Sequence, residues 1–124
     1  MKKLDHVGIV TADLAQSLRF FEQMLGLTCT HQEEMPERGI RVAFLPIADT
    51  RLELIEPMHE QSEVSGFLAK RGPGLHHIAF DCASVPEGLE TLEPLKPGAH
   101  GAQVGFIHPK KTGGVLVELC LHET

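Results

Sequence analysis

The sequence contains two copies of one pattern, and this repeat limits the folds open to the chain more than any other feature. Residues 4–10 and 75–81 are both short apolar stretches with a histidine in third place, as in buried β-strands. The offset between His6 and His77 (77 − 6 = 71) is close to that between Glu53 and Glu118 (118 − 53 = 65). A repeat of this size is too long for a solenoid, so we expect duplication of one folding unit.

The first copy has the elements of a βαβββ module. A helix is predicted after the first strand, because apolar residues form one helical stripe between Asp13, a suitable N-cap, and Gly26, a suitable C-cap. Three strands should follow it: 27–31, 41–45 and 51–55, the last two forming a hairpin that turns through 46–50.

The second copy repeats this order in a shorter form. Residues 84–87 form a capping box, which predicts a second helix that Pro94 cuts short. A second hairpin is expected over 104–107 and 115–119. The strand between helix and hairpin looks shortened or missing in 89–101, and 62–71 is predicted to form a linking helix.

These elements predict an α+β fold of one domain spanning residues 1–124. We expect two paired βαβββ modules, 1–58 and 73–124, joined by a linker at 59–72. Together they should form a curved mixed sheet around a metal cup, with the second module shortened.

Strand alternation suggests what lies inside the cup. Glu53 and Glu118 point away from their aliphatic neighbours, and the same parity sets His6 against Asp5 and Val7, and His77 against His76 and Ile78. If the aliphatic side chains pack under the helices, two imidazoles and two carboxylates converge on the concave face. Because buried unpaired carboxylates are costly, one divalent cation would satisfy all four groups. Glu56 has the wrong parity, and His76 is expected to support the site.

The ligand type indicates a class of metal without selecting one member. Two carboxylates neutralise the ion, and an N₂O₂ set leaves two positions of an octahedral shell open for a substrate. Co²⁺, Mn²⁺, Ni²⁺, Fe²⁺, Mg²⁺ and Zn²⁺ all remain possible.

Charge and composition exclude some partners. The chain has 11 basic and 17 acidic residues, a net charge of −6, and neither Trp nor Tyr, so nucleic acids and anionic membranes are poor partners. No apolar run is long enough to cross a bilayer, and the N-terminus lacks the apolar core of a signal peptide. We therefore expect a cytoplasmic protein.

The order His, Glu, His, Glu over two βαβββ modules resembles the vicinal oxygen chelate superfamily, which includes glyoxalase I and the bleomycin-resistance proteins. Within it, nearly the whole chain is similar to the methylmalonyl-CoA epimerase family. The stretches that carry this likeness are 4–9, 44–46 with 52–57, 74–78, 98–101, and 106–110 with 113–119.

The resemblance implies a metal-dependent epimerase that binds one divalent ion through His6, Glu53, His77 and Glu118. It implies inversion of the α-carbon of methylmalonyl-CoA through an enolate that the metal stabilises, with Glu118 as the catalytic acid/base on one face. It also implies an acyl-CoA substrate as partner and a homodimer. The basic residues that could meet the CoA phosphates are Lys70, Arg71, Lys110 and Lys111.

Two departures from the family bear on the substrate. Some members have a second catalytic glutamate where this chain has Val42, so the acid/base group on the other face is unassigned. The short stretch 89–101 lacks part of a helix and strand that members usually have. Two alternatives therefore stay open: a glyoxalase I-like isomerase or lyase, and a non-catalytic protein that binds a small molecule, as the resistance proteins do.

Overall fold

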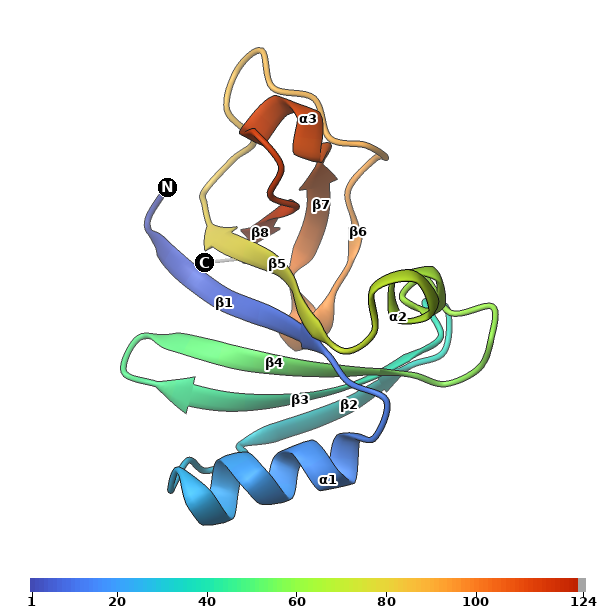
Figure 1. Ribbon diagram of the computed structural model, residues 1–124. Coiled ribbons are helices and arrows are strands. Elements are labelled where there is room, and N and C mark those ends of the chain that lie inside the picture. The colour runs from blue at the N-terminus through green and yellow to red at the C-terminus, as the bar shows by residue number, and fades with distance from the viewer. Residues whose placement is uncertain (123–124) are drawn as a thin grey trace.

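A computed structural model describes residues 1–122 and contains an eight-stranded mixed sheet in the order β2-β3-β4-β1-β5-β8-β7-β6. The strands are β1 (Lys3–Val10), β2 (His31–Met35), β3 (Ile40–Ile47), β4 (Thr50–Pro57), β5 (Gly74–Asp81), β6 (Lys96–Pro97), β7 (Gln103–Ile107) and β8 (Val117–Leu121). The helices are α1 (Leu14–Arg19), its π-helical continuation η1 (Phe20–Met24), α2 (Ser65–Arg71), the 3₁₀ turn η2 (Ala99–Gly101) and α3 (Pro109–Thr112). Figure 1 shows α1 lying along one face of the curved sheet, below β2, β3 and β4.

The two halves of the sheet have the same topology. In each half the first strand pairs in parallel with the last: β1 with β4, and β5 with β8. The halves join where β1 and β5 run antiparallel. The predicted α+β fold with a curved mixed sheet is therefore confirmed. The division into 1–58, 59–72 and 73–124 stays a prediction, and the last two residues of that range lie outside the described residues.

The first helix forms for the reasons that the sequence gives. The Asp13 side chain accepts a hydrogen bond from the Gln16 amide at 3.0 Å and so caps α1. Leu14 and Leu18 are buried against Ala43, Leu45 and Leu54 on the outer face of the sheet. Gly26 ends the element with the left-handed backbone expected of a C-cap (φ 72°).

The predicted second helix is wrong, because residues 82–95 form loops and turns. Pro94 leaves room for few helical turns after Ser84, and short helices are marginal without tertiary support. Val85 and Leu89 still cover the outer face, where they pack against Ile107 and Leu119. The shortened strand that we expected here is present as the two-residue β6.

Other boundaries also shift. The strand predicted over 27–31 is wrong except at its last residue: β2 runs from His31 to Met35, while Leu27 and Cys29 pack into the cluster beneath α1. The first hairpin turns at Ala48 and Asp49, so Pro46 lies within β3. The second hairpin contains α3 in its connection, and its last strand starts at Val117. The linking helix is confirmed as α2.

The inner face of the first half is apolar at one end. Its cluster consists of Val10, Met35, Ile40, Val42, Phe44, Ile55 and Val64, with Phe67 and Leu68 of α2 and Ala99 of η2 packed on it. The His100 ring lies 4.1 Å from the ring of His31 and 4.5 Å from that of Phe44, measured between centroids. Elements from the linker and the second half thus close over the first. Within residues 1–122, no helix is long and apolar enough to cross a membrane.

Candidate metal centre

The four residues predicted as ligands come together at the junction of the two halves. His6 lies on β1, Glu53 on β4, His77 on β5 and Glu118 on β8, the four adjacent central strands of the sheet. Each is only 4–7% exposed. Because each strand supplies one side chain to the same inner face, the duplicated fold itself produces the convergence.

The ligating atoms lie within a few ångströms of one another. The His6 Nε2 atom is 3.0 Å from His77 Nε2, 2.9 Å from Glu118 Oε1 and 3.2 Å from Glu53 Oε1. The His77 Nε2 atom is 3.3 Å from Glu118 Oε1 and 3.5 Å from Glu53 Oε1.

These separations match the edges of a coordination shell. Bonds of about 2.1 Å place neighbouring ligand atoms about 3.0 Å apart in an octahedron and about 3.4 Å apart in a tetrahedron. Two imidazole nitrogens and two carboxylates also suit a hard or borderline divalent ion. The residues present therefore fit the predicted metal, while the spacing fits several of the candidate ions.

The cluster stabilises charge within itself. Burial alone would lower the pKa of His6, but hydrogen bonds with Asp5, Glu118 and Glu53 raise it to about 11. Burial likewise opposes ionisation of Glu53 and Glu118, yet hydrogen bonds with His6 and His77 hold both carboxyl pKa values well below the usual range. The site is thus built to hold positive charge between two carboxylates.

Two β-bulges set the histidines, and simple alternation missed both. Asp5 is an extra residue on β1 between Leu4 and His6, and His76 is an extra residue on β5 beside His77. The parity prediction that opposed each histidine to the residue before it is therefore wrong. Asp5 Oδ2 instead accepts a hydrogen bond from His6 Nδ1 at 2.7 Å, and His76 Nδ1 lies 2.8 Å from His77 Nδ1.

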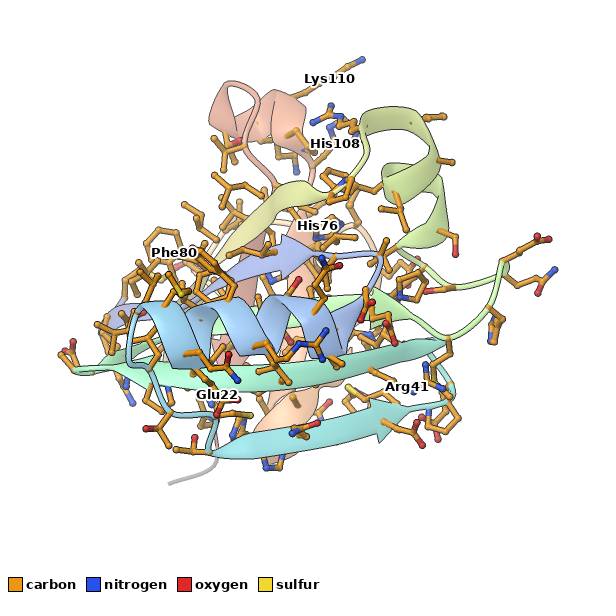
Figure 2. All side chains as sticks on the ribbon, turned by 60° about the horizontal axis from the view of Figure 1, so that its bottom comes forward. Glu22, Arg41, His76, Phe80, His108 and Lys110 are labelled. Atoms are coloured by element: carbon orange, nitrogen blue, oxygen red, sulfur yellow. The ribbon has the colours of Figure 1, made fainter. Side chains whose placement is uncertain are left out.

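His76 lines two hollows beside the centre. In Figure 2 it lies where β5 approaches α2, and its ring is 4.9 Å from that of Phe67. One hollow, of about 240 Å³, continues along Val104 and Phe106 of β7. The other, of about 580 Å³, reaches His77 and is bordered by Arg71, Leu116 and Pro109.

Glu56 lies outside the cup, as its parity predicted, and Val42 lies on the inner face. Glu56 is on the α1 side of β4, where its carboxylate accepts from the Leu14 amide and from Arg41. Val42 is fully buried within the apolar cluster of the inner face. Neither residue therefore places a carboxylate at the centre.

Sequence reasoning missed the polar residues behind the centre. Arg51 and His122 contact Asp5, and His100 contacts Arg51, with Arg51 Nη2 at 2.6 Å from Asp5 Oδ2. The Asp-His dipeptide at 5–6 was a signal, but only a bulge allows both side chains to face the same side.

Comparison with known proteins first defines the class. Residues 5–106 match the family model described as Glyoxalase/Bleomycin resistance protein/Dioxygenase superfamily. The chain belongs to this superfamily.

Individual relatives narrow the class to the methylmalonyl-CoA epimerases. The chain is 36% identical over 127 residues to the mitochondrial methylmalonyl-CoA epimerase of Homo sapiens, covering 94% of this chain and 72% of the human protein. It is 34% identical to the ethylmalonyl-CoA/methylmalonyl-CoA epimerase of Cereibacter sphaeroides, covering 94% and 96%. It is also 43% identical to the Bacillus subtilis protein YqjC, covering 97% and 92%.

Solved structures agree with this grouping. A variant of Streptomyces coelicolor methylmalonyl-CoA epimerase bound to 2-nitronate-propionyl-CoA superimposes with a TM-score of 0.92 at 35% identity, covering 100% of this chain and 99% of that one. The Mycobacterium tuberculosis methylmalonyl-CoA epimerase gives 0.89 at 32% identity, covering 98% and 88%. The predicted resemblance, and the prediction of an enzyme of the epimerase kind, are therefore confirmed.

Proposed function

We propose that this chain is a metal-dependent epimerase that inverts the α-carbon of methylmalonyl-CoA. The observation that carries the proposal is the convergence of His6, Glu53, His77 and Glu118 on one point. Its support is that relatives and structural neighbours with this fold are methylmalonyl-CoA epimerases.

The four side chains would hold one divalent ion and leave further coordination positions for substrate oxygens. Such an ion would stabilise the negative charge that develops on the substrate when the α-proton leaves, worth several kcal/mol. Glu118, held as a carboxylate, is the proposed proton acceptor on one face. The group on the opposite face is unassigned, since Val42 has no proton to exchange.

The partners follow from the same proposal. The substrate is an acyl-CoA, and Lys70 and Arg71 at the end of α2 and Lys110 and Lys111 on α3 are the proposed contacts for its phosphates. Of these proposed contacts, Arg71 borders the hollow of about 580 Å³ that His77 also lines. Figure 2 shows Lys110 extending outward from α3.

A homodimer and a cytoplasmic location remain predictions, and sedimentation velocity would test the first.

One experiment tests the activity. The purified protein is analysed for bound metal and incubated with methylmalonyl-CoA in D₂O, while NMR follows the α-proton. We expect exchange that stops on treatment with a chelator and returns when metal is added. If the α-proton exchanges equally with and without the chelator, or does not exchange at all, the glyoxalase-like or binding alternatives would be favoured.

A pair of isosteric variants tests the catalytic residue. Glu118→Gln should reduce turnover by at least about 1,000-fold, because it removes both a proton acceptor and a ligand charge. Glu56→Gln is the matched control: Glu56 lies on the α1 side of the sheet, so turnover should stay within about threefold. Equal losses in both variants would contradict the assignment of Glu118.

A further inference from the structure

Asp5 is a buried carboxylate that the proposed reaction does not use. It is 3% exposed and lies behind His6, on the side away from Glu53, Glu118 and His77. The β-bulge at this position turns its side chain toward the same face as His6. Its Oδ2 atom is 2.7 Å from His6 Nδ1.

The carboxylate is fixed through both oxygens. Arg51 Nη2 donates to Oδ2 at 2.6 Å, and His122 Nε2 lies 3.2 Å from Oδ1. Arg51 is itself held in place, because its Nη1 lies 2.7 Å from His100 Nδ1 and its guanidinium stacks 4.7 Å from the centre of the Phe44 ring. Rotation of the Asp5 side chain away from His6 would break its contacts with Arg51 and His122.

This arrangement decides which nitrogen of His6 can bind a cation. A carboxylate only accepts hydrogen bonds, so His6 Nδ1 must carry a proton and donate it to Asp5. A neutral His6 therefore has its lone pair on Nε2, the atom that faces the other three ligands.

We propose that Asp5 is a positioning residue of the metal centre, which fixes the ring orientation and the Nε2-ligating tautomer of His6. This inference rests on the proposed function, since it assumes that the four residues bind a cation. Carboxylate partners of this kind are general in metal sites, where their loss weakens metal binding about 10- to 100-fold.

His77 shows that the two histidines are not equivalent in this respect. Its Nδ1 atom faces the imidazole of His76 at 2.8 Å, whereas His6 faces a carboxylate. A charged acceptor makes the stronger hydrogen bond and raises the basicity of the ligating nitrogen more. His6 is therefore the more firmly fixed of the two imidazoles.

Zn²⁺ binding to the whole protein, with NMR of the imidazole nitrogens, tests the proposal without relying on activity. In the ¹⁵N-labelled, Zn²⁺-loaded wild type, long-range ¹H–¹⁵N correlations should show His6 protonated at Nδ1 and ligated at Nε2. Asp5→Asn should weaken Zn²⁺ binding about 10- to 100-fold and broaden or shift these His6 signals. Unfolding of the metal-free variant is measured separately, so that a loss of fold is not mistaken for a loss of affinity.

Asp81→Asn is the matched control. A carboxylate oxygen of Asp81 lies within 4.8 Å of ligand atoms of Asp5 and His122, so this variant removes a nearby negative charge and leaves the Asp5–His6 hydrogen bond intact. Its Zn²⁺ affinity should stay within about twofold of the wild type. Equal weakening in both variants would overturn the proposal in favour of a general charge effect.

A second variant covers the case in which Asp5→Asn does not fold. Arg51→Met keeps the aliphatic bulk but removes the cation that holds Asp5, and it should weaken Zn²⁺ binding about threefold or more. Unchanged affinity and unchanged His6 signals in the folded variants would overturn the positioning role alone. Failure of the wild type to bind Zn²⁺ would overturn the metal centre, and this inference with it.

Discussion

Gly8 lies on β1 directly opposite His77 on β5. The His77 imidazole occupies the space that a side chain at position 8 would need. A Cβ atom at Gly8 would lie 2.2 Å from His77 Cε1 and 2.7 Å from Nε2, closer than any non-bonded contact allows. Gly8→Ala should therefore displace the proposed ligand. We expect a loss of about 1–3 kcal/mol in the free energy of unfolding, together with weaker metal binding. Denaturant unfolding and metal titration would measure the two effects.

Gly66→Ala provides the control for that change. Gly66 lies in α2 with open space where its Cβ would stand. Alanine is the better helix former by about 0.5–1 kcal/mol, so the variant should be slightly more stable and bind metal normally. If Gly8→Ala binds metal as tightly as this control, metal binding does not depend on the position that the His77 ring occupies beside Gly8.

Val42 tests whether the fold can accept the carboxylate that some relatives have there. The side chain is fully buried among Met35, Ile40 and Val64. Val42→Glu should cost roughly 3 kcal/mol or more, because the cluster offers no partner for a charge, and it should not raise epimerase turnover. Val42→Met separates size from charge and should cost about 1–3 kcal/mol by thermal or denaturant unfolding. A stable, faster Val42→Glu enzyme would contradict this description of the inner face.

Between elements, Glu63 joins three segments that are distant in sequence. Arg38 of the β2–β3 turn donates to it through Nε at 2.8 Å, and Lys96 of β6 lies 3.2 Å away. Burial would raise the pKa of Glu63, but Arg38 and Lys96 outweigh it and lower the pKa below its usual value of 4.5. A carboxyl of this kind stabilises the fold above its unfolded pKa, and the stabilisation is lost as the pH falls through the folded pKa.

Glu63→Gln should thus lower the free energy of unfolding by about 1 kcal/mol at pH 7. The difference from the wild type should shrink as the pH falls below about 4.5, which unfolding curves over pH 3–7 would follow. Glu60→Gln, at an exposed position of the same linker, should track the wild type at every pH. A constant difference between Glu63→Gln and the wild type would mean that the ion pairs are not its cause.

At the scale of elements, the sequence predicted what depends on local pattern and missed what depends on distant contacts. Most strands follow from apolar alternation and α1 from its stripe and caps, whereas the strand expected over 27–31 lies at His31–Met35 instead. The duplicated spacing led to the four converging residues. The predicted second helix did not form, because its capping box is a local signal and Pro94 leaves few turns for a helix that needs tertiary support. The role of Asp5 was missed because a bulge depends on cross-strand register, which no single strand encodes.

At the scale of the whole molecule, an ion at the candidate centre would couple the unfolding of the two halves, because each half supplies two of its ligands. A cation bound there contacts the native state only, and at 100 times its dissociation constant it would add about 2.7 kcal/mol to the stability of both halves together. We expect calorimetry to show a single unfolding transition that moves upward with added metal. His6→Ala in one half and His77→Ala in the other should each abolish that upward shift, while His59→Ala, at an exposed position, should preserve it. Two separate transitions, or a shift that survives in either ligand variant, would mean that the halves are not joined through a common ion.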